Sequence, residues 1–255
     1  MNAIFGILAS PLAFALTTLY NITHNYGISL IILTIVVKII LYPFYKKQML
    51  STSGMAELGP KVNELKRQYA GDTATMNQKM QELYKEEGVN PMAGCLPMVI
   101  QMIVIMGLFT LLRNPLTYVH SERMYFAIHE NFLWINDLSQ SDPWILPVLA
   151  GVSTFASFYL GQKYGSMGIS PNQNQSKVMS LIMKYGFPIM ITWLAKTYAA
   201  GLATYWFLSQ FIQIFYNLRF NQIRKRMKEE KEKKGKKHAG RKNYEIGRAS
   251  CRERV

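Results

Sequence analysis

The chain has 255 residues, of which 49% are hydrophobic and only 17% are charged, whereas an average soluble domain is about 25% charged. The charges are unevenly placed, since no Lys, Arg, Asp or Glu occurs in residues 1–37, 88–112, 143–162 or 197–218. A helix needs about 20 mainly apolar residues to cross a hydrocarbon core of ~30 Å, and several stretches reach that length. The composition therefore excludes a soluble globular domain, a disordered chain and a disulfide-built secreted module.

The N-terminal segment, residues 1–26, is apolar, has Pro11 in its middle and lacks the basic start of a signal peptide. We expect an interfacial or re-entrant helix at the outer surface, with a cleaved or uncleaved signal anchor as the alternative. The first membrane span is predicted over residues 27–45, because an Ile, Val and Leu run ends there at Pro43.

Residues 46–92 are polar and are predicted to form a helical hairpin outside the membrane. Apolar residues recur there at alternating steps of three and four, which makes a narrow seam along a helix. A break at Gly71-Asp72 divides the seam into two antiparallel helices, and Gly88 is a typical helix stop. The seam consists of Met55, Leu58, Val62, Leu65, Tyr69, Met76, Met80 and Leu83.

The rest of the chain continues to alternate between apolar runs and polar segments. The predicted fold is therefore an all-α polytopic membrane protein with five transmembrane helices. The composition changes over residues 245–255, which we interpret as vector or assembly read-through. The remaining segments are a second span at 93–112, an external loop at 113–142, a third span at 143–162, a cytoplasmic linker at 163–177, a fourth span at 178–196, a fifth span at 197–218 and a basic cytoplasmic tail at 219–255.

Basic residues set the orientation. The net charge is +14, and 15 of the 29 basic residues lie in the tail, residues 219–255. Five spans place 25 of the 29 on the side of the hairpin, the linker and the tail. The positive-inside rule then predicts a multi-pass membrane protein with its N-terminus outside and its C-terminus in the cytoplasm. For the tail, two interpretations stay open: a tether for a ribosome or nucleic acid, or an anchor on anionic lipid.

Lys38 interrupts the first span about 10 Å from its cytoplasmic end. An ionised side chain near the middle of a membrane helix costs about 2.5–3.5 kcal/mol. One interpretation is a lysine whose ammonium reaches the interface along its own stem. The other is a functional site, because Thr34, Lys38 and Tyr42 follow at steps of four and share one helix face.

Polar residues in other predicted spans also favour a functional site around Lys38. A hydroxyl in a helix can bond to the carbonyl four residues earlier, and a glutamine can join two helices. Together, however, polar faces on several helices around one cation favour a hydrated cavity within the membrane. These residues are Gln101 in the second span, Ser153 and Ser157 in the third, and Tyr205, Trp206, Ser209 and Gln213 in the fifth.

The chain lacks the usual signatures of catalysis. It contains no nucleotide-binding, zinc-protease or nucleophile-elbow motif, and Cys95 and Cys251 have no metal-ligand spacing. No predicted span contains an acidic residue, which disfavours ion-coupled transport. We expect no enzyme activity and no cofactor or metal. A small channel or passive transporter, and a membrane-anchored tether, are the rival functions.

Four stretches of this sequence together resemble YidC/Oxa-type membrane protein insertases. The likeness extends over roughly residues 21–225 and matches the compact bacterial form, which implies a place in the bacterial plasma membrane. The stretches are NYGISLIILTIVVKIILYPFYKKQM at 25–49, GPKVNELKRQY at 59–69, ELYKEEGVNPMAGCLPMVIQM at 82–102 and DLSQSDPWILPVLAGV at 137–152.

The resemblance implies five core helices around a hydrophilic groove that is open to the cytoplasm and to lipid and closed outside. Lys38 would be the groove cation, where the family commonly has arginine, with Thr34, Gln101 and the pair Tyr205-Trp206 at groove positions. The protein would take hydrophobic segments of nascent membrane proteins into the lipid bilayer without nucleotide hydrolysis. The hairpin would receive substrate. Ribosomes, through the tail, and the Sec translocon are open further partners, and DNA is not expected.

Overall fold

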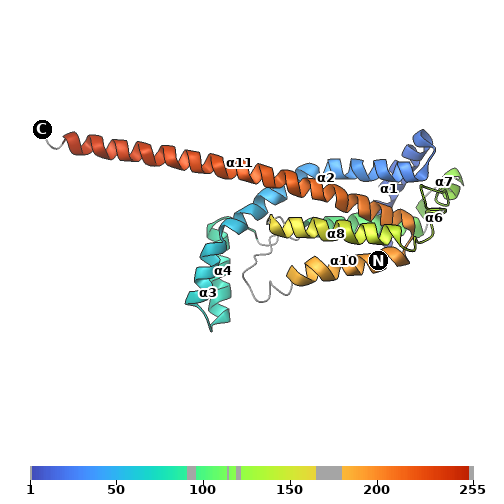
Figure 1. Cartoon of the computed structure of the whole chain (residues 1–255), viewed down its shortest axis with the longest axis horizontal. Helices are drawn as coiled ribbons and strands as arrows, with labels where there is room; N and C mark the ends of the chain where they lie inside the picture. The colour runs from blue at the N-terminus through green and yellow to red at the C-terminus, as the bar shows by residue number, and fades with distance from the viewer. Residues whose placement is uncertain (1, 91–95, 114, 119–121, 165–179, 253–255) are drawn as a thin grey trace. The chain divides into compact units, whose positions relative to one another are not determined.

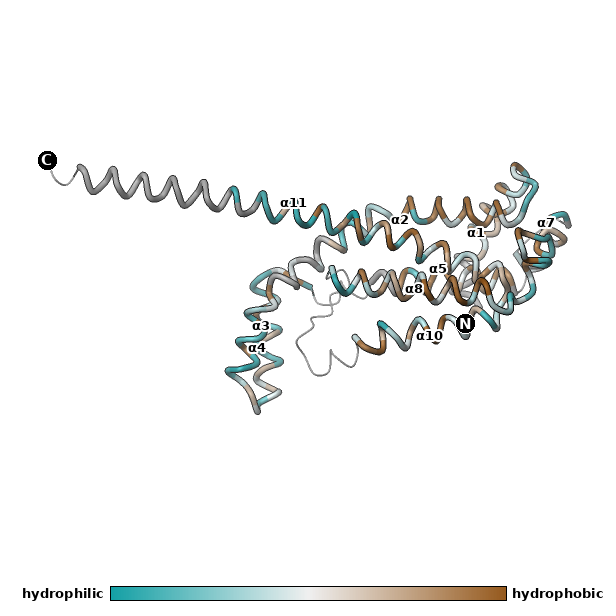
Figure 2. Tube along the Cα trace, viewed as in Figure 1, coloured by the Kyte–Doolittle hydropathy of each residue, from teal (hydrophilic) through white to brown (hydrophobic). Residues whose placement is uncertain are grey.

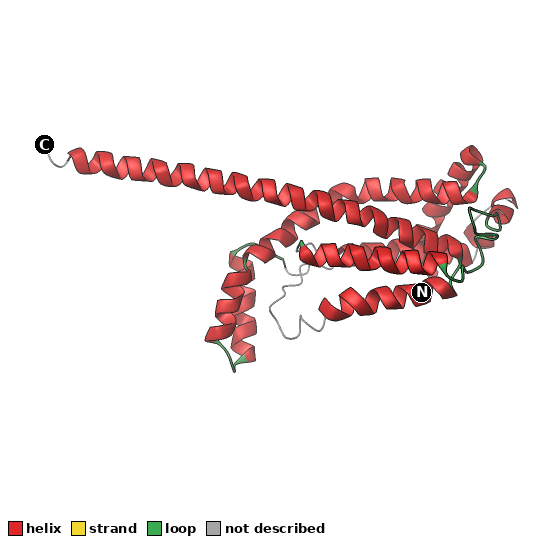
Figure 3. Ribbon diagram, viewed as in Figure 1, coloured by secondary structure: helices red, strands yellow, loops and turns green. Residues whose placement is uncertain are grey.

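The computed structural model describes residues 2–90, 96–113, 115–118, 122–164 and 180–252. The expected all-α class is confirmed for these residues, which form helices and no strand (Figure 3). One isolated bridge joins Phe132 and Ile135. In chain order the helices are α1 (Asn2–Thr23), α2 (Tyr26–Glu57), α3 (Gly59–Gln68), α4 (Thr73–Glu86), α5 (Leu96–Arg113), α6 (Pro115–Tyr118), α7 (Glu122–Ala127), α8 (Ile145–Lys163), the π-helical turn η2 (Ile182–Gly186), α10 (Phe187–Thr197) and α11 (Ala200–Arg252).

Two of the described helices are long and apolar enough to cross a membrane: Tyr26–Met49 within α2, and α8. The apolar part of α5, Val99–Leu112, is shorter than this length. The fourth predicted span starts within residues 165–179, which lie outside the described residues, and the polar side chains of α11 lower its hydropathy. Length and composition therefore support two spans, and the count of five stays a proposal.

α2 does not end near Pro43 but continues to Glu57. Residues 46–57, assigned above to the hairpin, therefore prolong the helix of the first span. α3 then begins at Gly59, with a proline in its first turn, and packs beside α4 (Figure 1). The turn between them uses Gly71 at φ 117°, a left-handed conformation that glycine adopts readily. Figure 2 shows that α3 and α4 are mostly hydrophilic.

The helix of the fourth predicted span widens just before Pro188. Over η2 the amide of Phe187 bonds to the carbonyl of Ile182, five residues back. Proline has no N–H, so Pro188 cannot donate to the carbonyl four residues earlier, and a π-helical turn is one way to accommodate that loss. α10 then packs closely on α8, where a Cβ added to Gly151 would lie 2.0 Å from Thr192 Oγ1.

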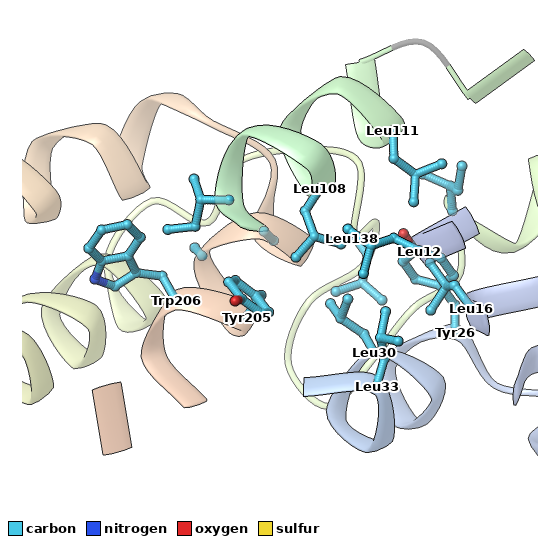
Figure 4. Packing of buried hydrophobic residues seen from close by; sticks show 14 of the residues in the cluster. Leu12, Leu16, Tyr26, Leu30, Leu33, Leu108, Leu111, Leu138, Tyr205 and Trp206 are labelled. Atoms are coloured by element: carbon cyan, nitrogen blue, oxygen red, sulfur yellow. The ribbon is translucent and has the colours of Figure 1, made fainter. Parts of the chain in front are cut away.

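The apolar core joins α1, α2, α5, α8, α10 and the start of α11 (Figure 4). The N-terminal segment, expected as an interfacial or re-entrant helix, forms α1, which packs on α5 and α2 through buried side chains such as Ala13 and Leu16. Leu30 and Leu33 of α2 and Leu108 of α5 continue this core. Figure 4 also shows Tyr205 and Trp206, which α11 contributes to it.

One loop caps the start of three helices. We name residues 128–144 the capping loop. Carboxylates and carbonyls of this loop accept the backbone N–H groups that a helix start leaves without an intrahelical partner. Three helices, α2, α8 and α11, therefore begin at this one loop. The bonds are Tyr26 N–H to Glu130 Oε2 (2.9 Å), Trp144, Ile145 and Leu146 N–H to the Asp142 carboxylate (2.9–3.3 Å), Ala200 N–H to Gln140 O (2.7 Å) and Gly201 N–H to Leu138 O (3.0 Å).

Replacing Asp142 with Ala is expected to lower stability by about 1–2 kcal/mol, the usual cost of losing a helix cap. Burial raises the pKa of this carboxyl, but hydrogen bonds from the Trp134 indole and from the amides of Trp144, Ile145 and Leu146 outweigh it and hold the pKa below its ordinary value. The cap therefore contributes fully above the unfolded pKa of about 3.9 and is lost as the pH falls through the lower folded pKa.

Thermal unfolding in detergent from pH 7 down to about pH 3 tests this expectation. The unfolding temperatures of the wild type and Asp142→Ala should differ at pH 7 and converge in acid. Asp142→Asn keeps an acceptor oxygen and should fall between them. A difference that persists undiminished at low pH would show that the loss is not due to the carboxylate cap.

Candidate functional site

Lys38 lies in the middle of the apolar part of α2, and its side chain is only 3% exposed. Its ammonium donates to Gln101 Oε1 of α5 at 3.2 Å and lies 5.3 Å from the centre of the Tyr45 ring. The two contacts are a hydrogen bond to a neutral amide and a cation–π contact. In the described part of the chain, no carboxylate lies within ion-pair distance of Lys38.

Gln101 is the centre of the polar contacts around this cation. Its Oε1 also accepts from Ser209 Oγ at 3.2 Å, and its Nε2 donates to Tyr205 OH at 3.1 Å. Ser209 and Tyr205 belong to α11 and are both buried. One amide side chain therefore connects α2, α5 and α11. We call Lys38, Tyr45, Gln101, Tyr205, Ser209 and Tyr216 the lysine cluster.

Tyr216 ties α11 to the backbone of Lys38. Its hydroxyl donates to the Lys38 carbonyl at 2.9 Å, and its ring packs against the rings of Tyr42 and Tyr45 with centroids 5.2 and 6.3 Å apart. Tyr42, a predicted site residue, thus touches the cluster through Tyr216. Tyr45 was not among the predicted residues, although its spacing of seven from Lys38 places both on one face of α2.

The other predicted site residues lie apart from the ammonium. Thr34 and Ser153 are buried, but their hydroxyls donate to carbonyls of their own helices, Leu30 O at 2.7 Å and Ala150 O at 3.1 Å. The Thr34 bond is the alternative that the sequence left open for hydroxyls in a helix, and the Ser153 bond is a variant of it that reaches three residues back. The structure therefore pairs Lys38 with Gln101 rather than with Thr34, one turn away.

A second polar cluster joins α11 to α8. Trp206 Nε1 donates to Thr154 Oγ1 at 2.9 Å, and Asn217 Nδ2 donates to the carbonyl of Ser157 at 3.0 Å. Gln213 donates to Asn217 Oδ1 at 3.4 Å. Four of these five side chains are buried, and Gln213 is half-buried. Trp206, Ser157 and Gln213 thus belong to an α8–α11 interface rather than to the lysine cluster.

The buried polar face of α2 continues beyond Lys38. Tyr45, Gln48 and Thr52 are all buried and follow it toward the helical hairpin. No group of three or more His, Cys, Asp or Glu suited to a metal ion occurs among the residues that the structure describes. The lysine cluster therefore provides one cation together with amide, hydroxyl and aromatic groups, and these lie along helices that are otherwise apolar.

Comparisons with known proteins agree over most of the chain. The family model of the 60Kd inner membrane protein matches residues 18–233. The membrane protein insertase YidC of Lawsonia intracellularis is 36% identical over 211 residues, which are 82% of this chain and 38% of that protein. YidC of Syntrophus aciditrophicus is 38% identical over 208 residues, 81% of this chain and 35% of that protein.

A solved structure gives the same result for the fold. The crystal structure of an active YidC insertase with its first transmembrane domain resolved matches with a TM-score of 0.57 and 26% sequence identity. The match covers 84% of this chain and 45% of that one. The chain thus spans less than two fifths of the length of the two curated relatives named above, and less than half of the solved chain.

Proposed function

We infer the function of this protein from its family, because the chain belongs to the 60Kd inner membrane protein family of YidC/Oxa1-type membrane insertases. We propose that it takes hydrophobic segments of nascent proteins from the cytoplasm into the lipid bilayer. Its immediate partners are then the nascent membrane protein and lipid. The observation that carries this proposal is the buried Lys38 held by a neutral amide in an apolar helical bundle.

The pairing of Lys38 with Gln101 suits a transient substrate contact. A cation held by a neutral amide at 3.2 Å has a weaker partner than a carboxylate, since the amide oxygen offers a dipole but no opposite charge. An acidic or carbonyl group in the polar flank of a substrate can replace Gln101 Oε1. Gln101, Tyr205 and Ser209 then offer donors and acceptors that lower the cost of bringing the flank into lipid.

The proposed path for the flank is a hydrated groove along the polar face of α2, from Thr52 through Tyr45 to Lys38. Attraction between the flank and Lys38 is stronger in the low dielectric of the bilayer than in water. Burial of apolar substrate residues, at ~25 cal/mol per Å², drives the step. The membrane potential assists acidic flanks. The protein itself consumes no nucleotide in this scheme.

The proposed topology has five spans, with the N-terminus outside and the C-terminus in the cytoplasm. Two observations support it. α2, α8 and α11, the first, third and fifth predicted spans, all begin at the capping loop, as alternating spans require. The five predicted spans also place 25 of the 29 basic residues on the side opposite that loop, as the positive-inside rule expects.

Reconstitution tests the function directly. Liposomes that contain only this protein are incubated with a ribosome-free, single-span substrate that carries a short acidic flank, and insertion is measured by protection of the flank from added protease. We expect protection well above that in protein-free liposomes. Ion flux through the liposomes without protection of any substrate would instead favour a channel.

Deleting residues 226–255 is expected to leave part of the ribosome-free activity intact. The deletion removes much of the basic tail while keeping the lysine cluster. The same liposome assay, with and without ribosome-bound nascent chains, separates the two roles of the tail. A tail that binds ribosomes should matter more for the ribosome-bound substrate. Loss of all activity toward the free substrate would favour a tether.

A further inference from the structure

The acidic groups of the capping loop are directed toward the protein itself. Each of its three carboxylates has hydrogen-bond partners within the chain, so the loop presents few charges to its surroundings. Glu130 accepts from the Tyr20 hydroxyl and the Tyr26 amide; Asp137 contacts His129 and accepts from the Ser139 amide; Asp142 accepts from the Trp144 amide, from the first two α8 amides and from Trp134 Nε1 at 2.8 Å.

Large apolar side chains of the same region point outward. Leu133 is 75% exposed and Trp134 is 45% exposed, both at the tip of the tight turn between Phe132 and Ile135. Trp144, at the end of the loop, is 69% exposed. Leu133 also has φ 55°, a left-handed conformation that is costly for a bulky residue. The loop therefore maintains a strained backbone at the position that presents a leucine.

The two tryptophans have the character of residues at a membrane surface. Such residues combine an apolar ring with a polar group, and they gather where helices leave the hydrocarbon core. The indole N–H of Trp134 is bonded to Asp142, and the ring of Trp144 lies 4.5 Å from Lys196 Nζ. α8, one of the two helices long enough to span a bilayer, begins at the residue directly after Trp144.

We propose that the capping loop inserts its tip, Leu133 and Trp134, together with Trp144, into the interfacial region of the lipid leaflet at which α2, α8 and α11 begin. The occupant of this apolar surface is thus lipid. Inward carboxylates and outward apolar side chains are the arrangement expected of a loop at the boundary between headgroups and acyl chains. The proposal does not depend on the insertase function or on which leaflet this is.

The anchor would also set the depth of the lysine cluster. The loop that contacts lipid fixes the first residue of α2 through the bond from Tyr26 N–H to Glu130. Lys38 follows twelve residues later, about 18 Å along the helix. In a core of ~30 Å this places it beyond the midplane, on the side of the hairpin.

Site-directed fluorescence in vesicles tests the proposal on the full chain. Cys95 and Cys251 are replaced by Ser, and a nitrobenzoxadiazole probe is attached at Leu133→Cys or, separately, at Trp144→Cys. The control is Asn136→Cys, an exposed polar position on the same loop. The vesicles contain phosphatidylcholine and phosphatidylglycerol, with or without lipid brominated in the upper acyl chain, and iodide serves as the aqueous quencher.

Brominated lipid should quench the probes at Leu133 and Trp144 about twofold or more, and iodide should quench them less than it quenches the Asn136 probe. Probes at Leu133 and Trp144 that behave like the Asn136 probe would place the loop in water and overturn the proposal. Probes shielded from both quenchers would show that a protein, such as a second copy of this chain, covers the surface, and this would overturn it equally.

Discussion

Lys38→Glu is expected to slow insertion of a single-span substrate with an acidic flank at least about tenfold, because attraction becomes repulsion. At an effective dielectric of about 20, two like charges 4 Å apart repel by ~4 kcal/mol. The variant also places a carboxylate beside the acceptor Gln101 Oε1, where the wild type has a donor at 3.2 Å. Initial rates of protease protection in liposomes measure the effect.

Two companion variants separate charge from packing at Lys38. Lys38→Arg keeps a cation and should insert the same substrate within about twofold of the wild type, because arginine stays charged in almost any surroundings. Lys38→Leu removes the cation without adding repulsion and should fall between the other two. A substrate with a neutral flank should lose less of its insertion rate with each of the three variants. Full activity of a folded Lys38→Glu protein would exclude a charge-based role.

Gln101→Leu is expected to lower both stability and insertion. It removes the oxygen that accepts from Lys38 and Ser209 and the donor to Tyr205, while all three partners stay in place. Leaving a buried polar group unsatisfied costs about 1–3 kcal/mol, and more for a charged one. The apparent unfolding temperature in detergent should fall, and the rate of insertion should fall with it.

A double-mutant cycle shows whether Gln101 acts through Lys38. If its main role is to hold the ammonium, Gln101→Leu should cost clearly less in a Lys38→Leu background than in the wild type. Met102→Leu provides a matched control, because Met102 is the next residue on α5 and its side chain is exposed. Equal costs in both backgrounds would show that the two residues are not coupled.

The sequence was most informative where a pattern repeats. Apolar runs and a helix-period seam indicated helices, and helices are found in the corresponding regions that the structure describes. The sequence was less informative about where a proline interrupts a helix. Both Pro43 and Pro188 lack the N–H that a helix uses, yet α2 continues through Pro43 whereas a π-helical turn precedes Pro188, and no periodicity distinguishes the two cases.

The sequence also did not predict the hydrogen-bond partner of each polar residue. Steps of four placed Thr34 on the same face as Lys38, yet Thr34 bonds to its own helix while Gln101, 63 residues away, contacts the ammonium. Spacing identifies a helix face but not the neighbour that the face meets. α11 illustrates this, since Tyr205 is directed to α5 and the adjacent Trp206 to α8.

Most of the capping loop had no signal of its own; only Asp142, directly before the third predicted span, is a typical residue for the start of a helix. The loop has no period, and its bonds to the starts of α2, α8 and α11 join residues up to 104 positions apart. Only folding brings Glu130 to the amide of Tyr26, because the free N–H groups at a helix start donate to whichever carboxylate the chain packs nearby. The orientation of the acidic groups toward the protein, with Leu133 and Trp144 outward, follows from these bonds.

By itself the sequence determined that this is a helical membrane protein, which end of each predicted span carries the basic residues, and that one lysine interrupts the first apolar run. These are properties of composition and local spacing, so a single chain displays them directly. The tertiary structure alone decided that Lys38 pairs with a neutral amide, that α11 divides its polar face between two neighbours, and that one loop caps three helices. Each of these depends on contacts between distant residues, which exist only once the helices have packed.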